Sequence, residues 1–177
     1  MPILAIIIAA VIVFGVAGGV AFAATSKDVE VNDYEAVWND YDGLFKKWAS
    51  VYEIPWYWLK GICLNETLLG TVPSVIAGTA SDDGLSYGIM QLQLDTASQY
   101  ADKVASISDL NNKEFSIMTA AKYVYHLSNL FNGDEHSVII SYNQGEGKTL
   151  AGHDYTKDYY DRFTRWKQKI ESREGLA

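Results

Sequence analysis

The sequence predicts a mainly α-helical domain with little sheet, preceded by one helix that crosses a membrane. Residues 3–24 contain no charged side chain, and after them apolar residues recur at steps of three and four, the spacing of one helix face. Gly, Pro and small polar residues separate these periodic stretches. The length of 177 residues fits one domain with an appendage. We therefore divide the chain into an apolar segment (1–24), a polar tether (25–33) and a folded domain (34–177).

The apolar segment has the length of a membrane-spanning helix. Its 22 uncharged residues, 3–24, would span roughly 33 Å at about 1.5 Å per residue, close to the thickness of a bilayer's hydrocarbon core. A cleaved signal peptide is the alternative, because Ala21, Phe22 and Ala23 form an A-x-A processing site. The run is longer than an ordinary signal core and no Lys or Arg precedes it, which favours a retained anchor. The residues that follow lack a positive excess, so we expect the domain on the outer side of the membrane.

Charge and the metal-binding residue types exclude several functions. The formal net charge is −8, and all charged residues follow residue 24. Such an acidic domain without a basic stripe would repel phosphate, so no nucleic-acid partner is expected. The single cysteine, Cys63, excludes an intrachain disulfide and a multi-thiolate zinc site. His126, His136 and His153 show no ligand spacing, so we expect neither a metal nor a cofactor.

Helical spacing predicts two helices in the first part of the domain. The first begins at Tyr34 and continues its apolar face through Trp48. The second has Pro55 in its first turn, stops at Gly70 and shares one apolar face among Leu59, Ile62, Cys63 and Leu69. Residues 71–86 contain Pro, Gly and small polar residues without a period. We expect a loop there, with room for a short hairpin.

Capping residues mark the helices of the second part. Asp95 can cap a short helix to residue 104, Asn112 a longer one to residue 133, and Asp134 a third to residue 142. The last expected helix spans residues 156–170, where the aromatic side chains lie in phase.

One carboxylate lies on a helix face that should be buried. Glu66 follows Ile62 by four residues and Cys63 by three, so its side chain shares the apolar face of the second helix. Burial disfavours the charged form and raises the pKa of a carboxyl group, which prepares it to donate a proton near neutral pH. The alternative is a glutamate at the helix end that reaches past Leu69 to solvent. Motifs elsewhere in the chain favour the first interpretation.

Four short motifs follow one another along the domain. They are Glu66 with Thr67, residues 84–92 (GLSYGIMQL), residues 141–145 (SYNQG) and Tyr159 with Tyr160. The set resembles the soluble lytic transglycosylase (SLT) family of the lysozyme-like fold, which shows a Glu-Ser pair, a Gly-x-x-Gly-Leu-Met-Gln-Leu motif, an Ala-Tyr-Asn-Ala-Gly motif and a late Tyr in the same order. The resemblance covers about residues 48–166 and implies a single lysozyme-like domain of the goose-type/SLT class. Asp95 and Gln144 depart from it, because the family has Pro and Ala at these positions.

The resemblance assigns Glu66 as the catalytic acid and base. Gly88 would let the backbone approach the sugar, and Tyr142 would face Glu66 across the cleft. The alternative roles are core packing for Met90 and Tyr142, and loop capping for Gln91 and Asn143. The implied substrate-binding residues are Thr67, Ser86, Tyr87, Gly88, Met90, Gln91, Tyr142, Asn143 and Tyr159.

The implied reaction cleaves the β-1,4 bond between N-acetylmuramic acid (MurNAc) and N-acetylglucosamine (GlcNAc) in peptidoglycan. Glycosidic cleavage needs an acid for the leaving oxygen and a group that captures the oxocarbenium-like centre. In the family that this chain resembles, the sugar's own C6 hydroxyl captures the centre after the same Glu has removed its proton. The product is a 1,6-anhydroMurNAc end, so Glu66 would suffice without a second carboxylate.

Two other functions stay open. The related goose-type lysozymes hydrolyse the same bond with added carboxylates, and Asp82 occupies one of their acidic positions while Gln93 occupies the other. The glutamine at position 93 favours transglycosylation over hydrolysis. Asp82 and Asp83 also fit a solvated turn without a catalytic role. A non-catalytic wall-binding or structural module held at a membrane would stack aromatic residues such as Trp56 on sugars. Such a module has no need to bury a carboxylate.

The expected partners are peptidoglycan glycan strands and, through residues 3–24, a lipid bilayer. The protein would then be membrane-anchored, with its catalytic domain on the periplasmic or outer side, or held in a virion membrane if a phage encodes it. Bacterial and phage origin both stay open.

Overall fold

The computed structural model describes residues 33–175, so the predicted anchor (1–24) and the tether up to residue 32 lie outside the described part. The predicted mainly helical class is confirmed for the domain. Within residues 33–175, none of the helices combines the length and the apolar character that crossing a bilayer requires. The elements are, in chain order, α1 (Asp33–Ala36), α2 (Asp42–Val51), α3 (Trp56–Thr67), α4 (Pro73–Ala77), β1 (Ser86–Tyr87), β2 (Leu92–Gln93), α5 (Leu94–Tyr100), α6 (Ile107–Asn111), α7 (Lys113–Leu130), α8 (Glu135–Gln144), α9 (Glu146–Leu150) and α10 (Lys157–Glu174).

Helix α3 forms the centre of the core. Every residue at positions 58–65 is buried, so the helix is enclosed on all sides rather than along one stripe. It packs against α2, α7 and α10. Gly61 permits the close approach of α10, because a Cβ atom there would lie 2.6 Å from the ring of Phe163. Lys60 is fully buried, and its ammonium faces Asp42 Oδ1 at 2.7 Å without the alignment of a hydrogen bond.

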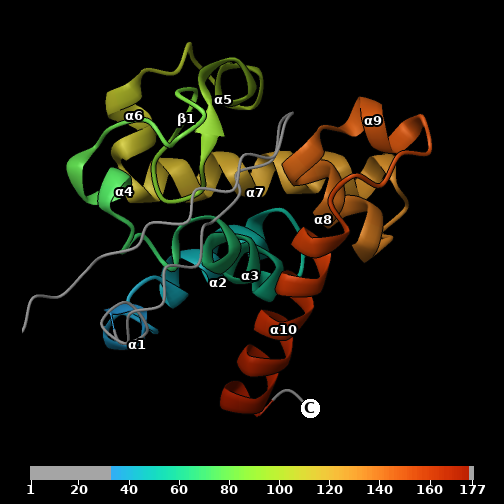
Figure 1. The fold of residues 1–177 in the computed structure, drawn as a ribbon, viewed down its shortest axis with the longest axis horizontal. Coiled ribbons are helices and arrows are strands. Elements are labelled where there is room, and N and C mark those ends of the chain that lie inside the picture. Colours follow the sequence, from blue (N-terminus) through green and yellow to red (C-terminus); the bar gives the residue numbers. More distant parts are fainter. Residues whose placement is uncertain (1–32, 176–177) are drawn as a thin grey trace, which may run out of the picture.

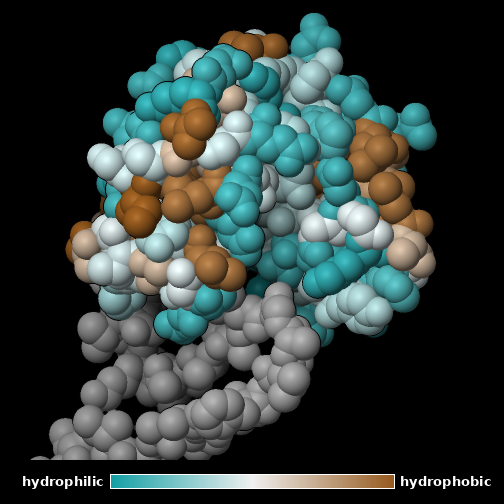
Figure 2. All heavy atoms as spheres, turned by 90° about the horizontal axis from the view of Figure 1, so that it is seen from above, coloured by the Kyte–Doolittle hydropathy of each residue, from teal (hydrophilic) through white to brown (hydrophobic). Residues whose placement is uncertain are grey.

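Two lobes extend from this core, as Figure 1 shows. The first lobe (residues 73–111) holds α4, the strands, α5 and α6, and the second lobe (residues 135–155) holds α8 and α9. The long helix α7 extends across both. The two strands pair antiparallel, with Ser86 opposite Gln93 and Tyr87 opposite Leu92. Seen from above in Figure 2, hydrophilic residues occupy the middle of the face, between two groups of apolar side chains.

The first two helices differ from the prediction. A turn over residues 37–41 separates α1 from α2, where one continuous helix was expected. Its Asn-Asp pair favours a turn over a helix interior. Helix α3 ends at Thr67 instead of reaching Gly70, because Leu68 and Leu69 adopt the left-handed conformation with φ of 48° and 60°. The Gly70 N–H donates to the Thr67 hydroxyl at 3.0 Å and closes the turn.

Three short helices were not predicted. Helix α4 lies inside the expected loop 71–86, where Pro73 occupies the first turn and Gly78 ends the helix in the left-handed conformation. Ser106 and Asp109 form a capping box at the start of α6. Helix α9 follows Gly145 directly. Each of the three has five residues, which is too few for a helical period to appear in the sequence.

The predicted caps of two longer helices are confirmed. Asn112 and Asp134 each accept a hydrogen bond from the backbone N–H of the third residue that follows, at the starts of α7 and α8. Asp95 is not a cap: it lies in the first turn of α5, because β2 leads directly into that helix. Helix α5 ends at Tyr100 rather than at residue 104, α8 continues to residue 144, and α10 continues to residue 174.

Candidate active site

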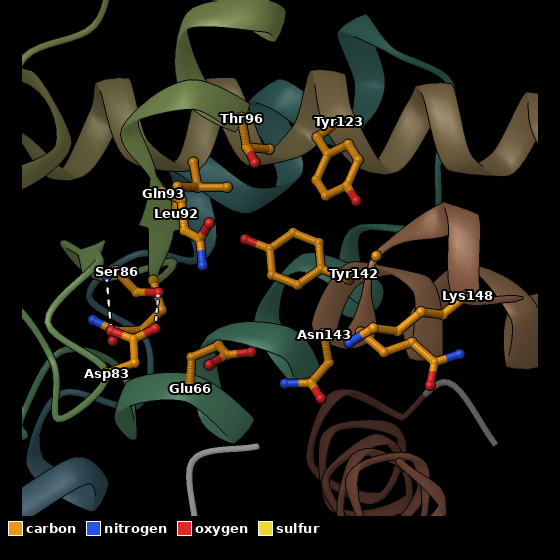
Figure 3. A pocket seen from close by; sticks show the side chains of 13 residues that line it. Glu66, Asp83, Ser86, Leu92, Gln93, Thr96, Tyr123, Tyr142, Asn143 and Lys148 are labelled. Atoms are coloured by element: carbon orange, nitrogen blue, oxygen red, sulfur yellow. Dashed lines mark hydrogen bonds between the residues drawn. The ribbon is translucent and has the colours of Figure 1, made fainter. Parts of the chain in front are cut away.

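A pocket of about 320 Å³ opens between the two lobes. This volume lies at the lower end of small-molecule sites, which range over roughly 300–1,000 Å³. Figure 3 shows the side chains of the first lobe and of α8 and α9 pointing toward the same space, with Glu66 entering it from α3 and Tyr123 from α7. The lining residues, most of which are polar, are Glu66, Asp83, Ser86, Gln91, Leu92, Gln93, Thr96, Tyr123, Tyr142, Asn143, Gln144, Gly145 and Lys148.

Glu66 is held in this pocket by a tyrosine from the last helix. It follows the buried residues Ile62 and Cys63 on α3, as the sequence predicted, and its carboxyl group opens into the pocket. The Tyr159 hydroxyl donates a hydrogen bond of 2.6 Å to Glu66 Oε1. Since Tyr159 is itself buried on α10, its hydroxyl fixes the carboxyl group from a rigid position.

The surroundings bring the pKa of Glu66 close to neutrality. Burial raises this pKa to about 7, although the hydrogen bond from Tyr159 and the charge of Arg162 act in the opposite direction. The negative charge of Asp83 adds to the effect of burial. A carboxyl group with such a pKa is protonated in about half of the molecules at pH 7, so it can serve as an acid in one step and as a base in the next.

Asp83 is a second carboxylate in the pocket, and it has a different character. Its Oδ1 accepts hydrogen bonds from the Ser81 hydroxyl (2.5 Å) and from the N–H groups of Leu85 (2.8 Å) and Ser86 (3.0 Å), while Oδ2 accepts from the Ser86 hydroxyl (2.7 Å). Burial alone would raise the pKa of Asp83, but these hydrogen bonds outweigh it and lower the pKa to about 2. Asp83 therefore stays ionised and orders the loop before β1.

The pocket brings together predicted residues from three of the four motifs: Glu66, Ser86, Gln91, Tyr142 and Asn143. The fourth motif contributes Tyr159 through its contact with Glu66. Residues separated by up to 93 positions along the chain thus meet at one site.

Two of the gathered residues also bind backbone groups of the motif at residues 84–92. The Tyr142 hydroxyl donates to the Met90 carbonyl at 2.7 Å, so it is directed at the backbone rather than at Glu66. The Gln91 amide donates to the Gly88 carbonyl at 2.9 Å. These side chains line the pocket and hold its wall in place.

Besides Tyr159, four of the residues that the resemblance implied lie outside the pocket lining: Thr67, Tyr87, Gly88 and Met90. The Gly88 backbone packs on α6 instead of opening toward a sugar, because a Cβ atom there would lie 1.9 Å from the Leu110 carbonyl oxygen. The side chain of Met90 is fully buried in the core, which matches its alternative role. The Thr67 hydroxyl is buried and donates to the Ile89 carbonyl at 2.7 Å, so it joins α3 to the hairpin.

Several residues of the pocket lining were not predicted from the sequence. Asp83 was interpreted only as part of a turn, and Asp82, the acidic residue that was singled out, is exposed and outside the lining. Gln144 belongs to a recognised motif, and its departure from the family pattern was a signal that could have identified it. Tyr123 and Lys148 carry no local signal, because only the packing of α7 and α9 brings them to the pocket. In the part of the chain that the structure describes, no three His, Cys, Asp or Glu side chains group as metal ligands.

The transglycosylase SLT domain matches residues 43–163, which include all four motifs and both lobes around the pocket. The chain belongs to the transglycosylase SLT domain family. This membership confirms the resemblance found in the sequence.

A phage protein is among the relatives of this SLT domain. The chain is 33% identical over 112 residues to the peptidoglycan transglycosylase gp16 of Escherichia phage T7. The alignment covers 62% of this chain and 8% of that protein, so the chain spans only a small part of its relative's length.

Proposed function

We propose that this SLT domain is a peptidoglycan lytic transglycosylase that cleaves the MurNAc-β-1,4-GlcNAc bond and leaves 1,6-anhydroMurNAc ends. The proposal rests on the carboxyl group of Glu66. This group opens into the pocket, accepts a hydrogen bond from the Tyr159 hydroxyl and has a pKa of about 7. Membership of the SLT family and the likeness to a phage peptidoglycan transglycosylase support the same reaction on the cell wall.

In the first step Glu66 acts as the acid. Its proton passes to the glycosidic oxygen while the bond from this oxygen to C1 of MurNAc breaks, which releases the 4-hydroxyl group of GlcNAc. C1 becomes an oxocarbenium-like centre, and Glu66 becomes a carboxylate. The hydrogen bond from Tyr159 strengthens as this charge forms, because hydrogen bonds to ionised acceptors are stronger than those to neutral ones.

In the second step Glu66 acts as the base. Its carboxylate removes the proton of the C6 hydroxyl group of the same MurNAc, and O6 forms a bond to C1. The anhydro ring closes, and Glu66 regains its proton for the next cycle. No water is consumed, so the reaction needs no group that activates water.

Hydrolysis is the competing outcome, and Asp83 is the residue that would support it. Both Asp82 and Asp83 are exposed, but only Asp83 lines the pocket. A general base works best when its pKa lies near the working pH, and a carboxylate with a pKa of about 2 is a weak base toward water. Gln93 also lines the pocket and supplies no carboxylate. These properties favour transglycosylation.

Clearing of a purified cell-wall suspension tests whether the protein is an enzyme. The full chain should lower the turbidity of the suspension, and Glu66→Gln should lower it at least ~10² times more slowly, because the amide cannot deliver a proton. Sedimentation of the protein with the walls, together with circular dichroism, shows that the variant still binds and folds. Wall binding without clearing by the unaltered chain would instead support a non-catalytic wall-binding module.

We also propose that residues 3–24 hold the domain at a membrane, with the pocket on the outer side. The support is the uncharged run of 22 residues, which lies outside the described part of the structure. The full chain should partition with membranes, and a chain without residues 1–24 should be soluble, monomeric and active. A mature protein that begins at Thr25 would identify the segment as a signal peptide. Aggregation of the shortened chain would show that the segment belongs to the fold.

A further inference from the structure

The pocket contains one lysine, and within residues 33–175 this lysine has no ion-pair partner. Lys148 lies on α9, and Figure 3 shows its side chain reaching from the second lobe toward Asn143. Seven of the ten lysines in this part of the chain form an ion pair with a carboxylate, and Lys148 is not among them. Its charge is therefore available to a ligand in the pocket.

The segment that presents this charge is fixed by Gln144, one of the two residues that depart from the family pattern. The Gln144 side chain is buried, and its Nε2 donates to the Thr149 hydroxyl (2.9 Å) and to the His153 carbonyl (2.7 Å). Its Oε1 accepts from the Tyr155 N–H at 3.0 Å. These three bonds close residues 145–155 into a compact segment, here called the arch, with Lys148 on its pocket side.

The arch is also tied to the helices beneath it. Glu146 Oε2 lies 2.8 Å from His126 Nε2 on α7, and Asp154 Oδ2 lies 3.3 Å from His136 Nε2 on α8. A charge on an ordered segment loses less conformational entropy when it binds a ligand than a charge on a loose one. The arrangement thus fixes the backbone that carries Lys148 beside the pocket, and the exposed side chain of Lys148 extends from this fixed point.

Opposite charges mark opposite ends of the pocket. Figure 3 shows Asp83 at one end and Lys148 at the other, with Glu66 and Asn143 between them. An anionic ligand is repelled from the Asp83 end and attracted to the Lys148 end. Complementary charges of this kind fix the register of a ligand more than they add to its affinity.

The proposed substrate carries carboxylates at regular intervals. Each MurNAc unit bears a lactyl group whose carboxyl either is linked to a stem peptide, which has free carboxylates of its own, or is itself free where the peptide has been removed. We propose that Lys148 binds such a carboxylate and makes this SLT domain selective for anionic glycan strands. The inference rests on the proposed function, since it concerns the substrate of the same pocket.

Three substrates separate the possible sources of the carboxylate. The first consists of strands with intact stem peptides, the second of the same strands with all carboxylates converted to neutral amides, and the third of strands without peptides, whose lactyl carboxylates are free. Cleavage rates for the full chain give kcat/KM on each. We expect kcat/KM to be about 2- to 5-fold higher on one of the anionic strands than on the amidated strands, which is the size of effect that an exposed ion pair gives. The difference should lie in KM and should shrink as the salt concentration rises.

Two variants show whether Lys148 causes the preference. In Lys148→Met, the rates on anionic and amidated strands should become nearly equal. Lys148→Arg should keep most of the preference for anionic strands. Lys157→Met is the matched control, because Lys157 is exposed, forms no ion pair within residues 33–175 and lies outside the pocket lining. This control should keep the full preference.

Either of two results would overturn the inference: no preference in the unaltered chain, or an undiminished preference in Lys148→Met. If Lys148→Met loses a preference for peptide-bearing strands, the stem peptide is the source of the carboxylate. If it loses a preference for peptide-free strands, the lactyl group is the source. Absence of cleavage on all three substrates would instead refute the proposed function, so the two failures are distinguishable.

Discussion

The Tyr159 hydroxyl lies 2.6 Å from Glu66 Oε1, although 93 residues separate the two along the chain. Helices α3 and α10 carry them, and these helices approach closely because Gly61 leaves room for the ring of Phe163. The position of the catalytic carboxyl group therefore depends on the docking of the last helix. A change at the α3–α10 contact should affect activity even when it lies outside the pocket.

Glu66→Gln should stabilise the fold at alkaline pH. The pKa of Glu66 is about 7 in the folded state against an ordinary value of 4.5, so between these pH values the folded state binds more protons than the unfolded state. Stability then falls as the pH rises from 4.5 to 7, and above pH 7 the ionised carboxylate costs about 3 kcal/mol. Glutamine avoids this cost. Thermal melts at pH 8 should show a higher Tm for the variant, with the difference closing toward pH 4.5. An equal Tm at pH 8 would argue against the raised pKa of Glu66.

The pH profile of kcat/KM should fall above pH 7, where Glu66 loses the proton that it donates. Tyr159→Phe removes a hydrogen bond that lowers this pKa, so the falling limb should move to higher pH while the rate drops. Tyr160→Phe is the control: its hydroxyl donates to Glu135 at 3.2 Å, so the limb should stay in place. A limb that moves equally in both variants would show that Tyr159 does not act through Glu66.

Asp83→Asn should move the same limb to lower pH, because the negative charge of Asp83 raises the pKa of Glu66. The variant should still produce anhydro ends, with a rate loss below the ~10²-fold typical of a missing catalytic base. Asp82→Asn, which changes the exposed neighbour outside the pocket, controls for the general loss of charge. Loss of cleavage by ~10²-fold or more in Asp83→Asn alone would assign Asp83 a catalytic role in hydrolysis.

Gly88→Ala should destabilise the protein far more than Gly84→Ala. Both glycines have a positive φ, 72° and 71°, so either change costs about 1–2 kcal/mol of backbone strain. At Gly88 the new Cβ would also lie 1.9 Å from the backbone oxygen of Leu110. At Gly84 no atom would lie within 4 Å of the new Cβ. Urea unfolding should therefore show a loss of about 3 kcal/mol or more for Gly88→Ala. Similar losses for the two variants would contradict the close packing of Gly88 on α6.

The sequence predicted the parts of the fold that depend on local signals. The longer helices α3, α7, α8 and α10 were recognisable because each has ten or more residues, over which the apolar spacing recurs for several turns. Asn112 and Asp134 mark the starts of two of them. Glu66 was recognisable because a carboxylate on an apolar face contradicts the pattern around it. The neighbouring motifs then gave its role.

The remaining features depend on contacts between distant segments. Lys148 lines the pocket on the arch that Gln144 closes, and Asp83 lines it on a loop that four hydrogen bonds order. Conversely, Thr67 and Gly88 belong to motifs of the site, but the structure uses them to pack α3, the hairpin and α6 together. A motif therefore identifies a site without separating the residues that line it from those that support it.

The chemical form of the new chain ends distinguishes transglycosylation from hydrolysis. Purified peptidoglycan is digested to completion with the full chain, and the soluble products are analysed by mass spectrometry, since an anhydro end is lighter than a hydrolysed end by one water. Because Glu66 is proposed to act alone, so that O6 of MurNAc bonds to C1 of the same sugar, we expect 1,6-anhydroMurNAc ends as the main product of the unaltered chain and none from Glu66→Gln. Reducing MurNAc ends as the main product would contradict it.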